Sequence, residues 1–277
     1  MGGRNTASGR TPPPAPAPPP MPIPPPAPKP KPKPKPKPQP TSTAIRLDTM
    51  DDASLSTFVT KAMSAKLPSG FHDDITQRLI YSAKWNDKPE VVPASKAEAA
   101  AKKQDAVVLY RTVNYNPKLK MLSSKVADSL RTDDAFSTGG WSGQYYGGGV
   151  YFSDKLSGSK YYGNVRNGNA PTTIGAVLNG KAKVVDMADL TGAKGLAWAM
   201  QHPAAARKLG LSIDKRRKNQ LRSARHQEGA YTAMAMAMGY NVVSSKVGIK
   251  ETYYTILDRS VLTTSTKDYY PRTRGMK

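Results

Sequence analysis

The most informative part of the sequence runs Gly147-Gly-Gly-Val-Tyr-Phe-Ser-Asp-Lys-Leu-Ser-Gly-Ser-Lys-Tyr-Tyr-Gly163. A glycine-rich segment leads into a short β-type segment, residues 150–153, and then into a stretch with helical character. Glycine lets a ligand approach the main chain closely. Aromatic rings and a hydroxyl just after such glycines suit a flat aromatic amide, which stacks between rings and forms hydrogen bonds at its edge. The stretch therefore predicts a strand followed by a helix, with a binding site for a planar amide.

The spacing of the residues in this stretch is more specific than its composition. Ser159 follows Tyr151 by eight residues, and Tyr162 follows it by eleven. These offsets resemble the NAD-binding segment of the poly(ADP-ribose) polymerase and ADP-ribosyltransferase superfamily, which reads Gly-x-Tyr-Phe-(Ala/Ser)-Asp, followed by a Ser and a second Tyr at the same spacings. The resemblance implies that Tyr151 is the triad tyrosine, that Tyr162 stacks on nicotinamide and that Ser159 bonds the nicotinamide amide. It implies that Gly149 is the glycine behind that site.

Residues 106–112, upstream of the motif, form a short apolar run that is rich in β-branched residues and predicts a buried strand. In the superfamily, the first residue that contacts NAD lies at the end of such a strand; it is His in the polymerase-like branch and Arg in the toxin-like branch. The resemblance puts Arg111 at this position and Thr112 where a Gly usually follows the His. A guanidinium presents a planar fork of donors that suits a pyrophosphate or a ribose edge. The alternative is an ordinary strand-end charge that faces solvent.

Further strands of the family are expected downstream. Residues 172–186 resemble the next two family strands, and Asn179-Gly180 between them predicts a hairpin turn. Near the C-terminus, residues 239–243 and 252–258 resemble the closing strand pair. The second segment resembles the family strand Glu-Tyr-Ile-Val-Tyr-Asp, whose first residue is the catalytic glutamate. When the two are aligned on the final Asp, this position is Tyr253.

The catalytic carboxylate is therefore where this chain departs from the family. That glutamate normally polarises a ribose hydroxyl and steadies the cation-like transition state. Glu251 lies two residues before Tyr253, so on an extended strand both side chains point to the same face, about 7 Å apart along the chain. The toxin-like branch carries Glu-x-Glu or Gln-x-Glu here, whereas this chain reads Glu-Thr-Tyr. Three alternatives stay open: Glu251 reaches the ribose through a shifted register or a bulge, the substrate supplies its own carboxylate, or catalysis is lost.

The composition argues against several classes of site. The chain has 277 residues and no cysteine, so it has neither a disulfide framework nor a cysteine-based metal site. Its histidines, His72, His202 and His226, lack ligand spacing, and no metal is expected. No apolar run approaches the length of a membrane span, and the start of the chain lacks the apolar core of a signal peptide. We therefore expect a cytoplasmic protein with no membrane contact, which could be delivered into a host cell as an effector or a phage-borne protein.

The first 42 residues have a composition of their own. Residues 11–28 are almost all Pro and Ala, and residues 28–38 alternate Lys with Pro. Because proline fixes φ and removes donors, this segment predicts a disordered, extended arm of polyproline type. The arm is either a plain spacer, a cationic tether to nucleic acid or a docking peptide.

The formal net charge of +22 extends beyond the arm. The densest remaining basic run is Lys215-Arg-Arg-Lys218, and Arg222 and Arg225 follow it on a stretch that we expect to be helical. Such a basic stretch is either a solvated face or a contact for a polyanion, and with this overall excess of charge the Lys215–Arg225 stretch and the arm are candidates for nucleic-acid binding. Aromatic residues are not interleaved with the basic ones, and base-specific readout is not predicted.

The segment between the arm and the first predicted strand is mainly helical. Asp51 or Asp52 predicts the N-cap of a helix whose apolar residues recur at helical spacing. Residues 72–83 and 95–103 predict further helices. We interpret this segment as a small helical cap.

The expected fold is α+β, with the split two-sheet fold of the ADP-ribosyltransferases. Two facing sheets would hold NAD in a cleft formed by residues 105–270. A helical cap at 43–104 and a disordered Pro/Lys-rich arm at 1–42 would precede this catalytic domain, and a basic tail at 271–277 would follow it.

The resemblance implies a mono-ADP-ribosyltransferase, which moves ADP-ribose from NAD to a macromolecular acceptor, protein or nucleic acid, and releases nicotinamide. A host protein is the expected acceptor, NAD is the co-substrate and no metal is required. The expected catalytic residues are Arg111, Tyr151, Glu251 and Tyr253. The alternative is a catalytically inactive module that binds NAD or ADP-ribose in a basic, nucleic-acid-associated structural protein.

Overall fold

The computed structural model describes residues 44–67, 73–85, 87–114, 122–132, 149–161, 170–214, 220–223, 229–247 and 250–266. The chain divides into two units, Met1–Thr41 and Ser42–Lys277, and all the described residues belong to the second. The arm predicted at 1–42 and the tail at 271–277 lie outside the described residues.

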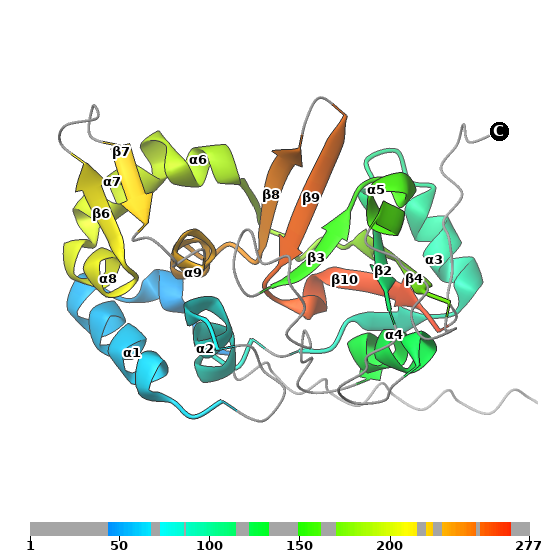
Figure 1. The fold of residues 1–277 in the computed structure, drawn as a ribbon, viewed down its shortest axis with the longest axis horizontal. Coiled ribbons are helices and arrows are strands. Elements are labelled where there is room, and N and C mark those ends of the chain that lie inside the picture. Colours follow the sequence, from blue (N-terminus) through cyan, green and yellow to red (C-terminus); the bar gives the residue numbers. More distant parts are fainter. Residues whose placement is uncertain are drawn as a thin grey trace, which may run out of the picture. The chain divides into compact units, whose positions relative to one another are not determined.

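An eight-stranded mixed sheet is the main β-structure of the second unit (Figure 1). Its strands are β1 Glu90–Val92, β2 Val108–Val113, β3 Val150–Ser153, β4 Thr172–Leu178, β5 Val184–Asp186, β8 Val242–Val247, β9 Glu251–Ile256 and β10 Leu262–Ser265. They follow the order β1-β10-β4-β2-β3-β9-β8-β5, in which β1–β10 and β5–β8 are parallel and the other neighbours are antiparallel. Together with the helices, this sheet confirms the α+β class.

The two halves of the sheet meet at a narrow junction between β2 and β3. Tyr110 opposite Ser153 is the one register pair of this junction, whereas β2 and β4 share six pairs and β3 and β9 share four. The large sheet is therefore continuous across this junction, because β2 and β3 are hydrogen-bonded neighbours, and the two facing sheets of the expected split fold stay a prediction.

The described helices confirm the helical character predicted for the segment before β2. The helices are η1 Leu47–Thr49, α1 Asp52–Ser64, α2 Ile75–Ser82, α3 Ala94–Ala101, α4 Ser123–Thr132, α5 Leu156–Tyr161, α6 Met187–Thr191, α7 Ala193–Gln201, α8 Pro203–Lys208, α9 Ala230–Ala237 and η2 Arg259–Val261. Asp51 is the N-cap of α1, and its side chain accepts a hydrogen bond from the Ser54 amide at 2.7 Å. Asp52 caps another helix, α8.

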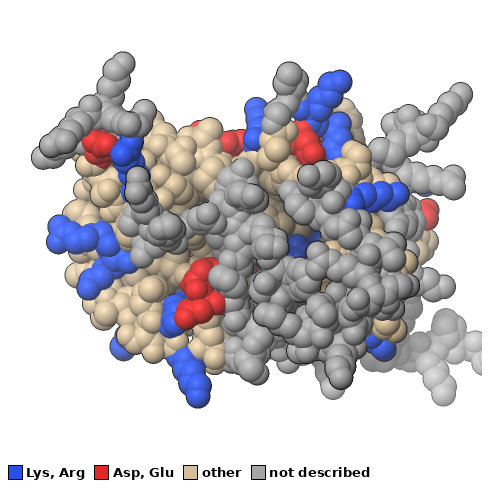
Figure 2. Space-filling view, viewed as in Figure 1, with Lys and Arg blue, Asp and Glu red and all other residues tan. Residues whose placement is uncertain are grey.

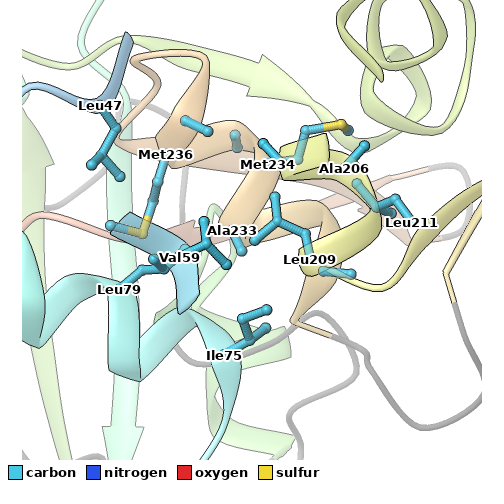
Figure 3. Packing of buried hydrophobic residues seen from close by; sticks show 14 of the residues in the cluster. Leu47, Val59, Ile75, Leu79, Ala206, Leu209, Leu211, Ala233, Met234 and Met236 are labelled. Carbon is cyan, nitrogen blue, oxygen red and sulfur yellow. The ribbon is translucent and has the colours of Figure 1, made fainter. Parts of the chain in front are cut away.

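The helical segment shares a hydrophobic core with later parts of the chain. The sequence of α9, Ala-Tyr-Thr-Ala-Met-Ala-Met-Ala, is apolar on all sides, and such a helix is buried. Met234 and Met236 of α9 are fully buried, and Figure 3 shows them among residues of η1, α1, α2 and α8, including Leu47, Val59 and Ala206. A second core lies under β2, β3, β4 and β9 and includes residues of α4. The predicted cap is thus packed as part of the unit that carries the sheet.

The hairpin predicted at Asn179-Gly180 is wrong. β4 lies between β10 and β2, while β5 pairs with β8 at the opposite edge of the sheet. Asn179 is tied to η2 instead: its Nδ2 donates to the Ser260 carbonyl at 2.8 Å, and its amide donates to the Val261 carbonyl at 2.8 Å. These distant contacts direct the chain away from a local hairpin.

The helix expected over the Lys215–Arg225 stretch is also wrong where the structure describes it. Residues 211–223 contain an antiparallel pair, β6 Leu211–Asp214 and β7 Gln220–Ser223. Leu211, Ile213 and Leu221 pack on the first core, and alternate packing of this kind belongs to a strand. Arg222 forms an ion pair with Asp214 at 3.2 Å, whereas residues 215–218 and Arg225 lie outside the described residues.

Substitution of Asp52 tests how much its contact with α8, which joins the helical segment to the rest of the unit, contributes to the free energy of unfolding. Its carboxylate accepts hydrogen bonds from the Ala205 amide at 2.9 Å and the Ala204 amide at 3.1 Å, and so caps α8, which has no side-chain cap of its own. We expect Asp52→Ala to lower the free energy of unfolding by about 1 kcal/mol in urea denaturation of the full chain. The exposed Asp105 serves as a charge-matched control, because Asp105→Ala removes no such cap. Equal midpoints for both variants would contradict the capping role.

Candidate functional site

β3 and β9 bring the predicted catalytic residues of these strands onto one face of the sheet. In the antiparallel pair, Ser153 lies opposite Tyr253 and Tyr151 lies opposite Thr255. Alternation along β9 puts Glu251 on the same face as Tyr253. The closing strand pair is confirmed as β8 and β9, with bounds shifted from those expected, and so is the shared face of Glu251 and Tyr253.

The carboxylate of Glu251 lies between β3 and α5. The Ser153 hydroxyl donates to Glu251 Oε1 at 2.6 Å, a length typical of a hydrogen bond to a charged acceptor. A Cβ atom built on Gly158 of α5 would collide with the same carboxylate. The register between β8 and β9 is continuous from Glu251 to Ile256, so β9 contains no bulge over these residues, while a register shifted relative to the family stays a prediction.

Ser159, the residue expected at the nicotinamide amide, contacts Thr112, the residue that follows Arg111 on β2. The Ser159 side chain is buried, and its Oγ lies 2.8 Å from Thr112 Oγ1. Thr112 Oγ1 is also 2.8 Å from Thr173 Oγ1, its neighbour across β2 and β4. A hydroxyl has one donor and two acceptor positions, so Ser159 can accept a further hydrogen bond while it keeps Thr112.

Arg111 is a largely covered cation at the junction between β2 and β3. Alternation puts it on the opposite face of β2 from Thr112, and its Nη1 donates to the Tyr151 carbonyl at 2.8 Å. Its Nε is buried and has no hydrogen-bond partner in the part of the chain that the structure describes. Burial lowers the pKa of the guanidinium to about 10, and only the influence of Tyr151 opposes this change. The alternative of a charge that simply faces solvent therefore does not hold.

Gly149 and Tyr162 are the other two residues that were predicted to contact NAD. Gly149 lies where a Cβ atom would be 2.9 Å from the Ile256 carbonyl, so its absent side chain lets β3 pack against β9. Its contact with NAD stays a prediction. Tyr162, the expected stacking ring, lies outside the described residues.

Sequence reasoning missed Ser153, Gly158 and Thr173. Ser153 occupies the Ala/Ser position of the motif, where the pattern gives no reason to choose the hydroxyl. A glycine inside a predicted helix, as at Gly158, indicates close packing. That signal was available and could have pointed to the contact with Glu251.

The described residues offer no other obvious metal or catalytic site. They contain no group of three or more His, Asp or Glu side chains that could hold a metal ion. His202 stacks on Trp198 with ring centroids 5.1 Å apart, and His72 and His226 lie outside the described ranges. No helix in those ranges is long and apolar enough to cross a membrane.

The chain matches none of the protein-family models, curated proteins or solved structures with which it was compared. The resemblance to the ADP-ribosyltransferases therefore rests on the motif residues.

Arg111→Met tests whether the covered guanidinium is retained for a ligand. A neutral side chain of similar length has no charge to desolvate, and we expect it to raise the free energy of unfolding by about 1 kcal/mol. If the Arg111 guanidinium donates hydrogen bonds to NAD, their loss should weaken NAD binding by about tenfold or more in calorimetry.

Arg78 provides the matched control, because its side chain donates to Met63, Ala65 and Asp73. Arg78→Met should therefore destabilise the protein. If Arg111→Met destabilised it equally, the guanidinium of Arg111 would have to be structural.

Proposed function

We propose that this chain is a mono-ADP-ribosyltransferase that moves ADP-ribose from NAD to a macromolecular acceptor and releases nicotinamide, and that its sheet is a form of the split fold of that superfamily. The observation that carries the proposal is the hydrogen bond of 2.6 Å from Ser153 to Glu251. It supports the proposal because it holds a carboxylate against α5, next to Ser159, on the face of β3 that carries Tyr151.

The proposed reaction needs a carboxylate at such a place. The bond between the nicotinamide nitrogen and C1′ of the ribose breaks, and its electron pair leaves with nicotinamide. A bond forms between C1′ and the acceptor nucleophile, which loses its proton. Positive charge develops on the ribose in the transition state, and a carboxylate that is already positioned there stabilises it. We assign this role to Glu251.

Other residues have properties that suit the binding of NAD. Arg111 has a covered Nε without a partner in the described structure, and the pyrophosphate or a ribose edge of NAD would satisfy it. Its side chain, however, lies on the face of the sheet opposite to Thr112, Tyr151 and Glu251, so the structure does not bring it together with them. Ser159 and Thr112 suit the nicotinamide amide, and Tyr162 is the expected stacking ring. Tyr151 would complete the site as the triad tyrosine.

Tyr253 favours transfer of a single ADP-ribose unit. Chain elongation in the polymerase branch depends on a glutamate at the position that the alignment gives to Tyr253. A phenol has a pKa near 10 and supplies no negative charge at neutral pH. The product should therefore be mono-ADP-ribose, and polymer ladders on a gel would contradict this assignment.

The second candidate function is a catalytically inactive module that binds NAD or ADP-ribose in a basic, nucleic-acid-associated structural protein. The absence of a carboxylate at Tyr253 and the net charge of +22 favour it. In the view of Figure 2, however, Lys and Arg side chains are spread over the described surface rather than gathered in one patch. The described surface in that view therefore does not single out a nucleic-acid site.

Glu251→Gln separates the two functions. If Glu251 stabilises the transition state, its loss should lower the rate of nicotinamide release by about two orders of magnitude, because such contacts contribute a few kcal/mol. NAD binding in calorimetry should stay nearly unchanged. Glu98→Gln on α3 is the control, since Glu98 lies on the surface and its ion pair among the described residues is with Lys102, at 3.9 Å.

The outcomes distinguish the proposals. Unchanged turnover in Glu251→Gln would leave catalysis assisted by a carboxylate of the substrate. Wild-type protein that binds NAD without releasing nicotinamide would be the inactive module. Absence of NAD binding would remove both candidates.

A further inference from the structure

The carboxylate of Glu251 contacts a diagonal neighbour across the strand pair. Ser153 lies directly opposite Tyr253, two residues from Glu251 along β9, and such diagonal positions are within reach of a long side chain. Contact between Ser153 Oγ and Glu251 Oε1 at 2.6 Å therefore ties the carboxylate to β3.

We propose that Ser153 and Gly158 are positioning residues that hold the Glu251 carboxylate in place in the candidate site. This inference rests on the proposed transferase function. It attributes the placement of the Glu251 carboxylate to two residues outside β9, one in β3 and one in α5.

The Ser153 hydroxyl is itself fixed. It is buried, it accepts a hydrogen bond from the Lys155 amide at 2.9 Å, and it lies 2.9 Å from the Lys155 carbonyl. The one hydroxyl proton has two acceptors within reach, and the carboxylate of Glu251 is the closer and the more strongly accepting. Ser153 therefore donates to Glu251 from an oxygen whose position the main chain determines.

Gly158 provides the space that the carboxylate occupies. Helix α5 packs on β2 and β3, and a Cβ atom on Gly158 would overlap the Glu251 carboxylate. Glycine inside a helix is less favourable than alanine, so its presence requires a reason. The contact with Glu251 supplies one, because any larger residue at this position would displace the carboxylate from Ser153.

Ser153→Ala tests the positioning role. Loss of one hydrogen bond to a charged group should lower kcat for nicotinamide release by about tenfold, while KM for NAD changes little. In a Glu251→Gln background the same substitution should cause no further decrease, because Ser153 acts through Glu251. An equal loss in both backgrounds, or no loss in either, would overturn the proposal.

Two control variants match these substitutions. Ser244→Ala also removes a buried serine hydroxyl from the same sheet, but on the face of β8 opposite to that of Glu251, and it should leave kcat unchanged. Gly158→Ala should lower kcat, whereas Gly180→Ala should not, because a Cβ atom on Gly180 meets nothing within 4 Å. Wild-type kcat in Gly158→Ala would contradict the proposed role of the glycine.

Unfolding measurements separate this inference from the proposed function. If wild-type protein released no nicotinamide, the transferase function would fail, but the contact could still be tested in urea denaturation. Ser153→Ala and Glu251→Gln should then shift the unfolding midpoint by amounts that do not add in the double variant, because the residues touch. Additive shifts would show that Ser153 does not hold Glu251.

Discussion

The pairing of Tyr110 with Ser153 at the junction of β2 and β3 is the constraint on which the sheet and the candidate site both depend. The pair joins the two halves of the sheet, and Ser153 also lies opposite Tyr253 and donates to Glu251. A single residue therefore connects the continuity of the sheet with the placement of the carboxylate. A change that widened the junction would also move the donor that fixes Glu251.

The two residues that follow Tyr110 on β2 differ in how well their polar groups are satisfied. Thr112 contacts two hydroxyls, whereas Arg111 buries its Nε without a partner among the described residues. Buried donors without partners destabilise a fold, and proteins commonly retain such groups where function requires them. Within the described part of the junction, Arg111 is therefore the residue whose buried donor opposes the stability of the fold.

Local patterns predicted the elements well and their partners less well. The β-branched run that contains Arg111 and the spacing of Glu251 and Tyr253 predicted β2, β9 and a shared face, because these features depend on adjacent residues. The Asn179 hairpin was wrong because Asn179 bonds to residues of η2, and the Lys215–Arg225 helix was wrong because a run of charge carries no periodicity. The contact of Ser153 with Glu251 depends on the register between β3 and β9, which the motif does not encode.

The position of β1 at one edge of the sheet has a consequence for synthesis on the ribosome. Among the described strands β1 pairs with β10 alone, and Thr263 Oγ1 donates to Glu90 Oε2 at 2.9 Å across a separation of 173 residues. An emerging chain thus exposes Glu90–Val92 long before its partner strand exists, and pairing over such a distance is slow. The same order of synthesis delays β9, so the carboxylate meets Ser153 only when nearly all of the sheet has been translated. Chains released early would carry the glycine motif without the strand that completes it, and their unpaired β-strand edges would favour aggregation.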